Sequence, residues 1–448
     1  MKKLLLWLVT LMLVVSVVAT FSLVSCKKEI KSAEEVAPAE EVAPAEEVAP
    51  AEIIELQLWD VFDPATSGDA VEREKLFRQY EEENPGIKIQ HNVLVYADLH
   101  EKAVVAGVAK SGPDILHMLG DWVPEFALMG IVEDVTDRVN TWEEKQYFPD
   151  STWSVANYEG VYYGIPSIAS PRALLYREDY LKEAGFTDPP ATWDEFKTIA
   201  QEVTKATEGV YGFGFCSSSG AIRGPQEFLP LLWQTGAEWV VKNNGQWVVG
   251  FTVEQMEEVF IFYNDLMNNL KVCPPDSIGW EYIEMDNSFV VGQSAMCQNG
   301  SWMALYSDEA GDSLKHWKVA PLPANKNRAT YFEVKVESIG KFSEHKDEAW
   351  ELLTWLMGKD QMAIHTRHDN LPSRTDVVSL PEFQEDEWVR SFLEVIPDGK
   401  PYPPIPMAES NTAMMDELQA VLYQQKTPAM AAESLLATLE DILMSINE

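Results

Sequence analysis

The chain has 448 residues, enough for two or three domains, since single domains run to roughly 100 to 200 residues. Its hydrophobic content of 46% and its 15 tryptophans indicate a globular protein with sizeable cores. The 72 acidic residues outnumber the 34 basic ones, and the resulting formal net charge of −38 repels phosphate backbones and argues against nucleic-acid binding.

The first 25 residues have the layout of an export signal. Two lysines at positions 2 and 3 precede an apolar run over residues 4–18, and Leu23-Val-Ser-Cys26 follows. This tetrapeptide resembles a bacterial lipobox, which implies cleavage before Cys26 and a lipid on its thiol. An uncleaved membrane anchor is the alternative, because the apolar stretch through Val24 is just long enough to span a bilayer. Either way, the body of the protein is expected outside the cytoplasm.

A low-complexity repeat separates this signal from the rest of the chain. From residue 34 the sequence Glu-Glu-Val-Ala-Pro-Ala occurs three times in succession. Regularly spaced prolines beside paired glutamates prevent a packed core and favour an extended, self-repelling chain. We therefore assign residues 1–25 to a lipoprotein signal peptide and residues 26–52 to a tether, so that contact with the membrane runs through the lipid anchor alone.

The folded part begins with alternating strands and helices. Two strand and helix pairs are expected between residues 54 and 109, and a third strand at 115–119 leads into a helix that begins at Asp121 and stops at Gly130. Such alternation predicts βα units on a mainly parallel sheet.

Acidic and aromatic residues follow two of these predicted strands. Trp59, Asp60 and Asp63 come at the end of the first strand, and Asp121 and Trp122 follow the third. The ends of strands in an open α/β sheet border a crevice where ligands bind, so these side chains are candidate ligand contacts. Core packing of its helix is an equally good role for Trp122.

A second α/β set follows the hairpin that Glu159-Gly160 predicts. Capping boxes at Thr192 and Thr252 each start a helix. Residues 294–303 then repeat the arrangement of the third strand, with a strand, a small polar turn and an aromatic residue, Trp302, at the start of a helix. Two such strand edges that face each other would form a cleft.

The other cysteines and the histidines predict no metal site. With Cys26 assigned to lipid, the remaining cysteines are Cys216, Cys273 and Cys297. No pair has CxxC or zinc-ligand spacing, so we expect buried, small apolar side chains. His365 and His368 beside Asp369 lack a further ligand at suitable spacing, and no metal or cofactor is expected.

Seven motifs in order carry a resemblance to a known family. They are Pro85-Gly-Ile-Lys-Ile89, Ser111-Gly-Pro-Asp-Ile115, Tyr163-Gly-Ile-Pro166, Ala184-Gly-Phe186, Pro190-Ala-Thr-Trp-Asp-Glu-Phe196, Gly292-Gln-Ser-Ala-Met296 and Leu371-Pro-Ser-Arg374. Together they resemble the extracytoplasmic solute-binding proteins of sugar ABC importers, the group that includes maltose-binding protein. The resemblance implies an α/β fold of the type II periplasmic-binding-protein kind, in which two lobes joined by a discontinuous hinge close over a ligand.

Alignment of the motifs divides the folded part into two lobes. The first would hold residues 53–168 with a return segment at about 328–369, and the second residues 170–326 with 370–448. The implied protein is a non-enzymatic receptor that captures a mono- or oligosaccharide by hinge closure and delivers it to the permease subunits of an ABC importer. It would act as a monomer at the outer side of the cell membrane.

The resemblance also places site residues, since a sugar requires aromatic plates for its apolar faces and paired polar groups for its hydroxyls. Asp121 aligns with a sugar-binding acid of the maltose-binding relatives, Trp302 with a stacking tryptophan, and Asn299 lies one turn from Trp302. On the facing lobe Ser170 stands where the maltose binder has a carboxylate. Arg172 beside it would meet an acidic sugar or form a salt bridge. Two further contacts are expected near the C-terminal helices, at Glu409 and Asn411.

Departures from the family pattern keep other functions open. The segment 331–335 lacks the glycines that many relatives have there, and Asp60, Asp63 and Asp121 would also suit a polyamine. Glycerol phosphate or a peptide are further solutes for a binding protein of this class. A secreted glycoside hydrolase is the remaining alternative, because acids and tryptophans also build glycosidase clefts, although such an enzyme needs two carboxylates that flank one bond.

Overall fold

The computed structural model describes residues 53–219 and 222–447. The signal peptide expected at 1–25, the tether at 26–52 and the lipid attachment at Cys26 lie outside the described residues. The described residues belong to one compact unit, Glu52–Glu448. Within them, no helix has both the length and the apolar character needed to cross a membrane.

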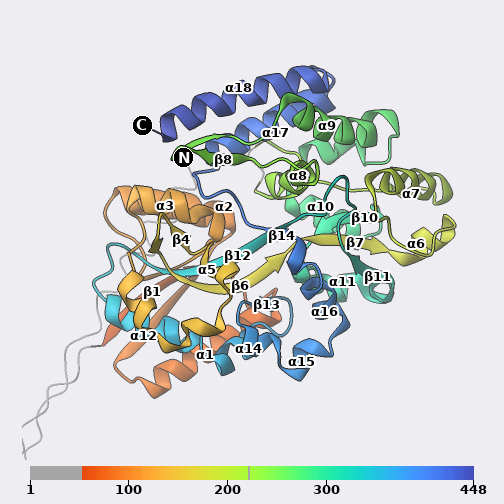
Figure 1. Cartoon of the computed structure of the whole chain (residues 1–448). Helices are drawn as coiled ribbons and strands as arrows, with labels where there is room; N and C mark the ends of the chain where they lie inside the picture. Colours follow the sequence, from red (N-terminus) through yellow and green to blue (C-terminus); the bar gives the residue numbers. More distant parts are fainter. Residues whose placement is uncertain (1–52, 220–221, 448) are drawn as a thin grey trace, which may run out of the picture. The chain divides into compact units, whose positions relative to one another are not determined.

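Strands and helices alternate along the N-terminal half, as the sequence predicts (Figure 1). In order they are β1 (Ile54–Asp60), α1 (Gly68–Glu83), β2 (Ile87–Val93), α2 (Tyr96–Val108), β3 (Ile115–Leu119), α3 (Val123–Met129), α4 (Thr136–Thr141), α5 (Asp150–Trp153), β4 (Asn157–Tyr158), β5 (Val161–Tyr162), β6 (Ile165–Pro171), β7 (Ala173–Arg177), α6 (Glu178–Glu183) and α7 (Trp193–Ala206).

The C-terminal half is richer in helices. Its elements are α8 (Arg223–Gln234), β8 (Val240–Asn243), β9 (Gln246–Val249), α9 (Val253–Asn264), α10 (Tyr282–Val290), β10 (Met296–Asn299), α11 (Ser307–Ala310), β11 (Trp317–Ala320), β12 (Thr330–Ile339), α12 (Lys346–Leu356), α13 (Lys359–His365), β13 (Leu371–Pro372), α14 (Thr375–Val378), α15 (Pro381–Gln384), α16 (Glu387–Leu393), β14 (Gly399–Lys400), α17 (Ala408–Leu422) and α18 (Pro428–Ile446).

The first lobe is built on a seven-stranded sheet with the order β13-β6-β12-β3-β1-β2 and with β14 beside β12. β1 pairs in parallel with β2 and β3, whereas β12 runs antiparallel to β3 and β6. The predicted parallel arrangement is therefore correct for β1 to β3 only, because β12 returns from the second half of the chain to fill the middle of the sheet. Every residue of β12 is buried.

The second lobe is built on the antiparallel three-stranded sheet β10-β7-β11. Pro171 ends β6 in the first sheet and Ala173 begins β7 in the second, so that Arg172 is the single residue between them. This short crossing places Arg172 at the boundary between the lobes.

The C-terminal assignment differs from the sequence expectation. β13, at residues 371–372, pairs with β6 in the first sheet, although residues from 370 onward were expected in the second lobe. The later helices α17 and α18 do belong with the second lobe, because they pack against its helix α9. The chain therefore completes the edge of the first sheet before it returns to the second lobe.

Local turn and cap chemistry acts where the sequence predicts it, with one exception. Thr192 and Thr252 each form the predicted capping box, with Glu195 and Gln255 respectively. Asp121, however, is not a helix cap. A short 3-10 helix over Gly120–Trp122 comes first, and α3 begins after it without a side-chain cap.

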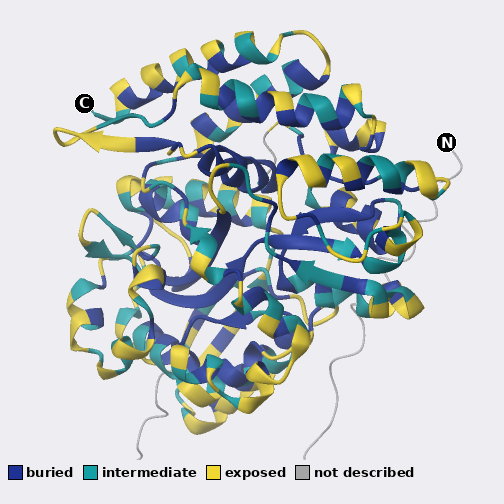
Figure 2. Cartoon of the chain, turned by 45° about the vertical axis from the view of Figure 1, so that its right-hand side comes forward, coloured by how far each residue is buried: buried dark blue, intermediate teal, exposed yellow. Residues whose placement is uncertain are grey.

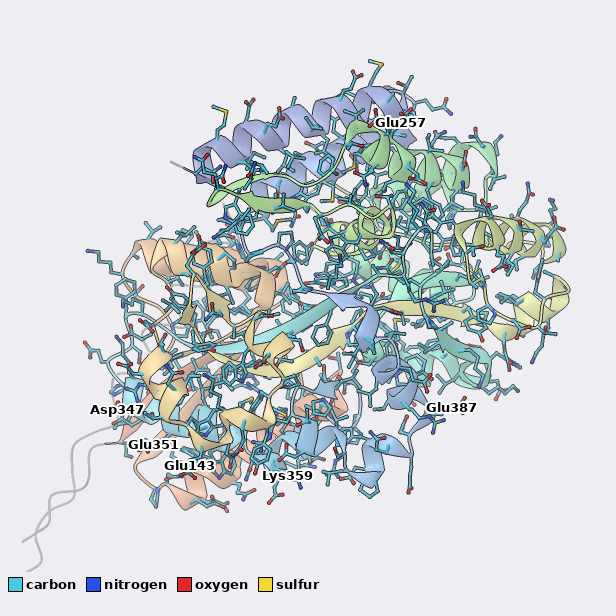
Figure 3. All side chains as sticks on the ribbon, in the orientation of Figure 1. Glu143, Glu257, Asp347, Glu351, Lys359 and Glu387 are labelled. Carbon is cyan, nitrogen blue, oxygen red and sulfur yellow. The ribbon has the colours of Figure 1, made fainter. Side chains whose placement is uncertain are left out.

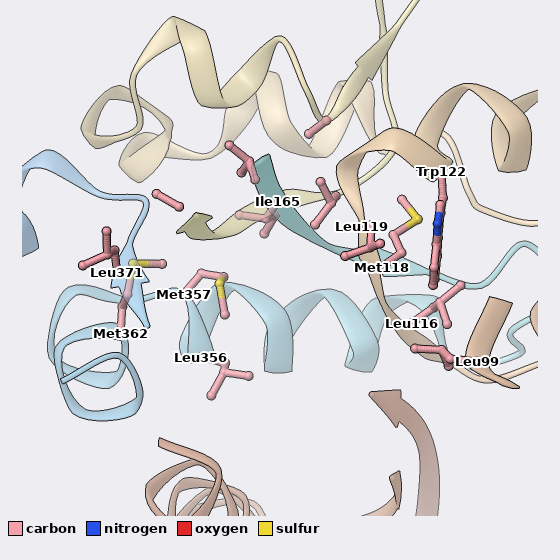
Figure 4. Packing of buried hydrophobic residues seen from close by; sticks show 14 of the residues in the cluster. Leu99, Leu116, Met118, Leu119, Trp122, Ile165, Leu356, Met357, Met362 and Leu371 are labelled. Carbon is pink, nitrogen blue, oxygen red and sulfur yellow. The ribbon is translucent and has the colours of Figure 1, made fainter. Parts of the chain in front are cut away.

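Two large hydrophobic clusters hold the elements together. One surrounds the first sheet and includes Met118 of β3, Ile165 of β6 and Leu356 of α12 (Figure 4). The other joins α7, α8, α9, α17 and α18. The strands are mostly buried and the outer helix faces exposed (Figure 2). Charged side chains such as Glu143, Asp347 and Glu351 cover the outside (Figure 3).

The three cysteines within the described residues are free and buried, as the sequence predicts. They are Cys216, Cys273 and Cys297. Burial raises the pKa of each thiol well above its usual value, so they remain uncharged.

Candidate functional site

A cavity of about 840 Å³ lies between the two lobes. Its size falls within the roughly 300–1,000 Å³ typical of small-molecule sites. The first lobe contributes the segments that follow β1 and β2, and the second lobe contributes α8, α10 and the turn after β10. The aromatic side chains that line it are Phe62, Tyr96, Tyr282, Trp302 and Tyr306.

The cavity lies where the sheet topology places it. The parallel strands β1, β2 and β3 end at one edge of the sheet, where Leu119 at the end of β3 and residues just beyond β1 and β2, such as Phe62 and Tyr96, line the cavity. The crevice beyond the carboxyl ends of such strands is the usual ligand position in α/β folds.

Four of the predicted site residues line this cavity: Asp63, Ser170, Arg172 and Trp302. Asp63 is exposed, and its Oδ1 accepts a hydrogen bond of 2.9 Å from the Ala65 backbone N–H. The Ser170 carbonyl oxygen accepts 2.8 Å from Nη1 of Arg172. The structure therefore brings these residues together from both lobes, although they lie far apart in sequence.

The described residues that line the cavity do not include Trp59 or Asp60. Trp59 packs against the first core and has the Lys102 ammonium 3.9 Å from its ring centroid. Asp60 is fully buried and holds His91 Nε2 at 2.7 Å and Arg73 Nε at 3.2 Å. Both carboxylate oxygens of Asp60 are thus engaged by side chains of its own lobe.

Trp122 packs as a core residue. Its side chain is buried, and its ring centroid lies 4.8 Å from that of His100 and 5.6 Å from that of Phe126. Of its two expected roles, this packing matches the core one.

Asp121 lies close to Glu333 and Lys335 without lining the cavity itself. Its Oδ1 is buried and has no hydrogen-bond partner among the described residues. Burial and the charge of Glu333 raise the pKa of Asp121 to about 7, against the opposing effect of His100 and Lys335. The side chain is therefore an acid with an unused oxygen that titrates near neutral pH.

The remaining predicted contacts lie outside the cavity lining. Asn299 is buried, where its Nδ2 donates 2.7 Å to Asp286 and its Oδ1 accepts 3.1 Å from Arg223 Nη1. It thereby orients two residues that do line the cavity. Glu409 is exposed on the first turn of α17, and Asn411, two residues later, is partly buried.

Sequence reasoning missed an ion cluster at the inner end of the cavity, made of Arg172, Arg223, Asp286, Glu333 and Lys335, of which only Arg172 was expected. Glu333 Oε2 lies 2.9 Å from Arg172 Nη2 and 3.0 Å from Lys335 Nζ. Arg223 Nη1 lies 3.3 Å from Asp286 Oδ1. We call these five residues the cavity cluster.

One signal for this cluster was present in the sequence. Glu333 and Lys335 alternate with apolar residues in the segment that lacks the family glycines, and period two places both on one face of a strand. Arg223 and Asp286 carried no comparable signal, because their position depends on how α8 and α10 pack.

The Trp302 ring packs against the guanidinium groups of Arg172 and Arg223 and against the backbone at Gly300. The guanidinium carbons of Arg172 and Arg223 lie 4.4 and 4.6 Å from its ring centroid, within cation–π range. A Cβ added at Gly300 would lie 1.7 Å from Cζ3 of Trp302, so only glycine lets the ring approach the backbone so closely.

The pKa shifts show how strongly the cavity cluster interacts. Burial alone would raise the pKa of Glu333, but Lys335 and Arg172 outweigh it and lower the value. Burial lowers the pKa of Lys335, which Glu333 opposes and both arginines reinforce. The three cations therefore share one electrostatic environment.

A second cavity, of about 910 Å³, adjoins the first. The two cavities share Thr66, Leu305, Asp308 and Asp369 in their linings. Trp388, whose Nε1 donates 3.0 Å to the Ser301 carbonyl, lies in the wall of the second cavity. The two cavities therefore share part of their walls.

The described residues contain no group of three or more His, Cys, Asp or Glu side chains placed to hold a metal ion. His365, considered from the sequence, is buried, and burial with the nearby Arg73 charge lowers its pKa to about 3. Asp369 binds Ser67 Oγ at 3.0 Å, and burial with the Asp69 charge raises its pKa to about 7.

Comparison with known proteins agrees with this architecture. A binding protein of Brucella abortus is 26% identical over 79% of this chain and 85% of its own length. The maltotriose-binding protein of Pyrococcus abyssi is 24% identical over 67% of this chain and 63% of its own. A Thermotoga lettingae ABC transporter solute-binding protein, solved with α-D-tagatose, has a TM-score of 0.79 at 23% identity and covers 87% of this chain and 100% of its own.

The likeness to solved structures shows the two-lobe fold that the motifs imply. The family model described as bacterial extracellular solute-binding protein matches residues 65–363, which include most of both sheets. This chain therefore belongs to the bacterial extracellular solute-binding protein family.

Proposed function

We propose that this protein is the extracytoplasmic substrate-binding component of an ABC importer and that it captures a mono- or oligosaccharide between its lobes. The observation that carries the proposal is the cavity of about 840 Å³, where Tyr282, Trp302 and Tyr306 accompany charged side chains from both lobes. Aromatic rings stack on the apolar faces of sugars, and ionised groups form strong hydrogen bonds to hydroxyls. One similar protein is named a maltotriose-binding protein, and another was solved with bound α-D-tagatose.

Function in this proposal is closure and release, without chemistry on the ligand. A ligand that touches both lobes shifts the open and closed populations by its preference for the closed form. Arg172 lies at the crossing from β6 to β7 and contacts Glu333 of the first sheet and Gln226 of α8 in the second lobe. Its contacts therefore join the two lobes that move in this proposal. We assign residues 53–168 to the first lobe and residues 170–326 to the second. We place the last crossing of the chain from the first lobe to the second between β14 and α17.

The position of the two cavities beside each other supports an oligosaccharide rather than a single sugar ring. The second cavity offers Tyr176, Trp317 and Trp388 beyond the first. In this proposal the monomer is tethered by a lipid on Cys26 and presents the filled lobes to the permease.

Calorimetric titration of the purified protein with maltose, maltotriose, lactose, galactose and tagatose tests the function. Spermidine and glycerol 3-phosphate serve as the comparison solutes. We expect saturable heat with at least one saccharide. Heat with spermidine or glycerol 3-phosphate and none with any saccharide would overturn the proposal. Hydrolysis of labelled maltotriose by the pure protein would contradict a purely binding role.

Trp302→Ala locates the site within the protein. We expect it to weaken saccharide binding by about 1–3 kcal/mol, the range of a well-packed aromatic contact. Trp247→Ala on β9, which lies outside both cavities, is the matched control. Equal affinity in both variants and the unaltered protein would show that the ligand binds elsewhere.

A further inference from the structure

The inner end of the first cavity carries an excess of positive charge, opposite to the bias of the chain. Of the described residues, the basic ones that line it are Arg172, Arg223 and Lys335, which are 2%, 7% and 8% exposed. The buried acids of the lining are Glu333 and Asp286, which pair with these cations and are 2% and 1% exposed, and Asp369, which is 5% exposed and binds Ser67 instead. Within the cavity cluster the buried cations therefore outnumber the buried anions by three to two, although the chain has a formal charge of −38.

The acids near the cluster do not cancel this excess. One oxygen of Glu333 serves both Arg172 and Lys335, at 2.9 and 3.0 Å. Burial raises the pKa of Glu227 to about 8 and, together with the Glu333 charge, that of Asp121 to about 7, so that the first is mainly protonated at neutral pH and the second partly.

A buried donor of the cluster is unused. Arg172 Nε is buried and has no hydrogen-bond partner among the residues that the structure describes. Leaving a buried polar group unsatisfied costs about 1–3 kcal/mol, and more when the group is charged. An acceptor supplied by a ligand would remove that cost.

The two guanidinium groups are held in position before any ligand arrives. Both lie over the Trp302 ring, at 4.4 and 4.6 Å from its centroid. Arg223 is also fixed by Asn299 at 3.1 Å, and Arg172 by the Ser170 carbonyl at 2.8 Å. Arginine forks that are fixed in this way suit the two oxygens of a carboxylate, and binding loses little side-chain freedom.

We infer that the ligand is a saccharide with a carboxylate group, a uronic acid or an oligosaccharide that contains one, and that Arg172, Arg223 and Lys335 receive this carboxylate. The inference rests on the proposed function and names its substrate class. A single carboxylate would bring the cavity cluster to neutrality, which hydroxyl groups cannot do. The exposed acids at the outer part of the cavity disfavour a second anionic ring there; they are Asp63, Asp308 and Glu309.

Matched pairs of sugars test the inference on the unaltered protein. Galacturonic acid is titrated against galactose, glucuronic acid against glucose, and digalacturonate against the neutral sugars of the first panel. We expect the acidic member of a pair to bind at least about tenfold tighter, a difference that shrinks as salt increases. Glucose 6-phosphate is included as a second anion.

The outcomes separate this inference from the proposed function. Neutral sugars that bind as tightly as their acidic partners overturn the inference and leave saccharide binding in place. Failure of every sugar, acidic or neutral, overturns both. Tighter binding of glucose 6-phosphate than of glucuronic acid overturns the assignment to a carboxylate.

Lys335→Met tests the cluster itself, with the exposed Lys205→Met as the matched control. We expect Lys335→Met to reduce the preference for the acidic sugar by about tenfold, while Lys205→Met keeps it. Arg223→Gln provides the same test if the first variant does not fold. A preference that survives both substitutions would contradict the inference.

Discussion

Two buried ion clusters each include residues from one face of β12. One of them lines the ligand cavity and the other does not. Period two places Glu333, Lys335 and Glu337 on the same face of the strand. Glu333 and Lys335 belong to the cavity cluster, which opens to the ligand site. Glu337 belongs to a second group, made of Asp60, Arg73, His91, His117 and Glu337, which we call the closed cluster.

The closed cluster pairs its charges within the first lobe. Glu337 holds His117 Nδ1 at 2.8 Å and Arg73 Nη2 at 3.2 Å, and Arg73 Nε lies 3.2 Å from Asp60. Burial alone would raise the pKa of Glu337, but Arg73 and His117 outweigh it and hold the value well below its usual range. These charges therefore stabilise the fold and offer nothing to a ligand.

The comparison teaches that buried charge alone does not identify a binding site. Both clusters contain arginine and glutamate, and among the described residues each has a buried arginine nitrogen without a hydrogen-bond partner, Arg172 Nε in one and Arg73 Nη1 in the other. Only the cavity cluster lines the ligand cavity. Asp60 illustrates the difference, since the sequence marks it as a ligand contact and the structure places it in the closed cluster.

The largest expected effect comes from breaking the closed cluster. Glu337→Gln leaves Arg73 with one acid partner fewer in a buried position, and we expect the free energy of unfolding to fall by about 3–5 kcal/mol. Urea unfolding measures the loss, and the exposed Glu351→Gln is the control. A loss below about 1 kcal/mol would mean that the closed cluster is not a stabilising unit.

An intermediate effect is expected from His365, which feels the charges of Arg73 and Glu337 at the border of the closed cluster. Its folded pKa of about 3 lies below its ordinary value of 6.5, so the neutral form is favoured by folding. The stability it contributes is fully present above pH 6.5 and is lost as pH falls toward 3, by at most about 1.4 kcal/mol per pH unit.

Unfolding at a series of pH values measures this loss. His365→Gln should flatten the acid side of the stability curve, whereas the exposed His368→Gln should leave it unchanged. Identical slopes for the two variants would show that His365 is not the titrating group.

The smallest effect concerns Asp121, on the side of the cavity cluster. Its folded pKa of about 7 lies above its ordinary value of 3.8, so stability is lost as pH rises from 3.8 to 7, where the acid ionises in the unfolded chain but stays protonated in the fold. Asp121→Asn removes that pH dependence, and we expect the gain of the ligand-free variant to be larger at pH 8 than at pH 5 by about 1–3 kcal/mol. Melting curves at both pH values, with the exposed Asp312→Asn as control, measure the gain. A gain of the same size at pH 5 would exclude ionisation as its cause.

The sequence alone determined what depends on neighbouring residues. Strand periodicity predicted β1, β2 and β3, and cap chemistry predicted the starts of α7 and α9, because both act over a few residues. The order of the strands also located the cavity at their carboxyl ends. Trp302, which the family resemblance placed in the site, and Asp63, which follows the first strand, both line the cavity.

Only the tertiary structure decided which side chains face that cavity. Glu333 meets Arg172 across 161 positions of sequence because β12 returns to the middle of the first sheet, and strand pairing over such distances leaves no local pattern. The same return of β12 brings Glu337 to Arg73 and His117, and it brings Lys335 close enough to Arg223 for that cation to lower the pKa of Lys335. Local chemistry set the elements, while contacts distant in sequence set the site, since the direction of a side chain depends on what packs against its strand or helix.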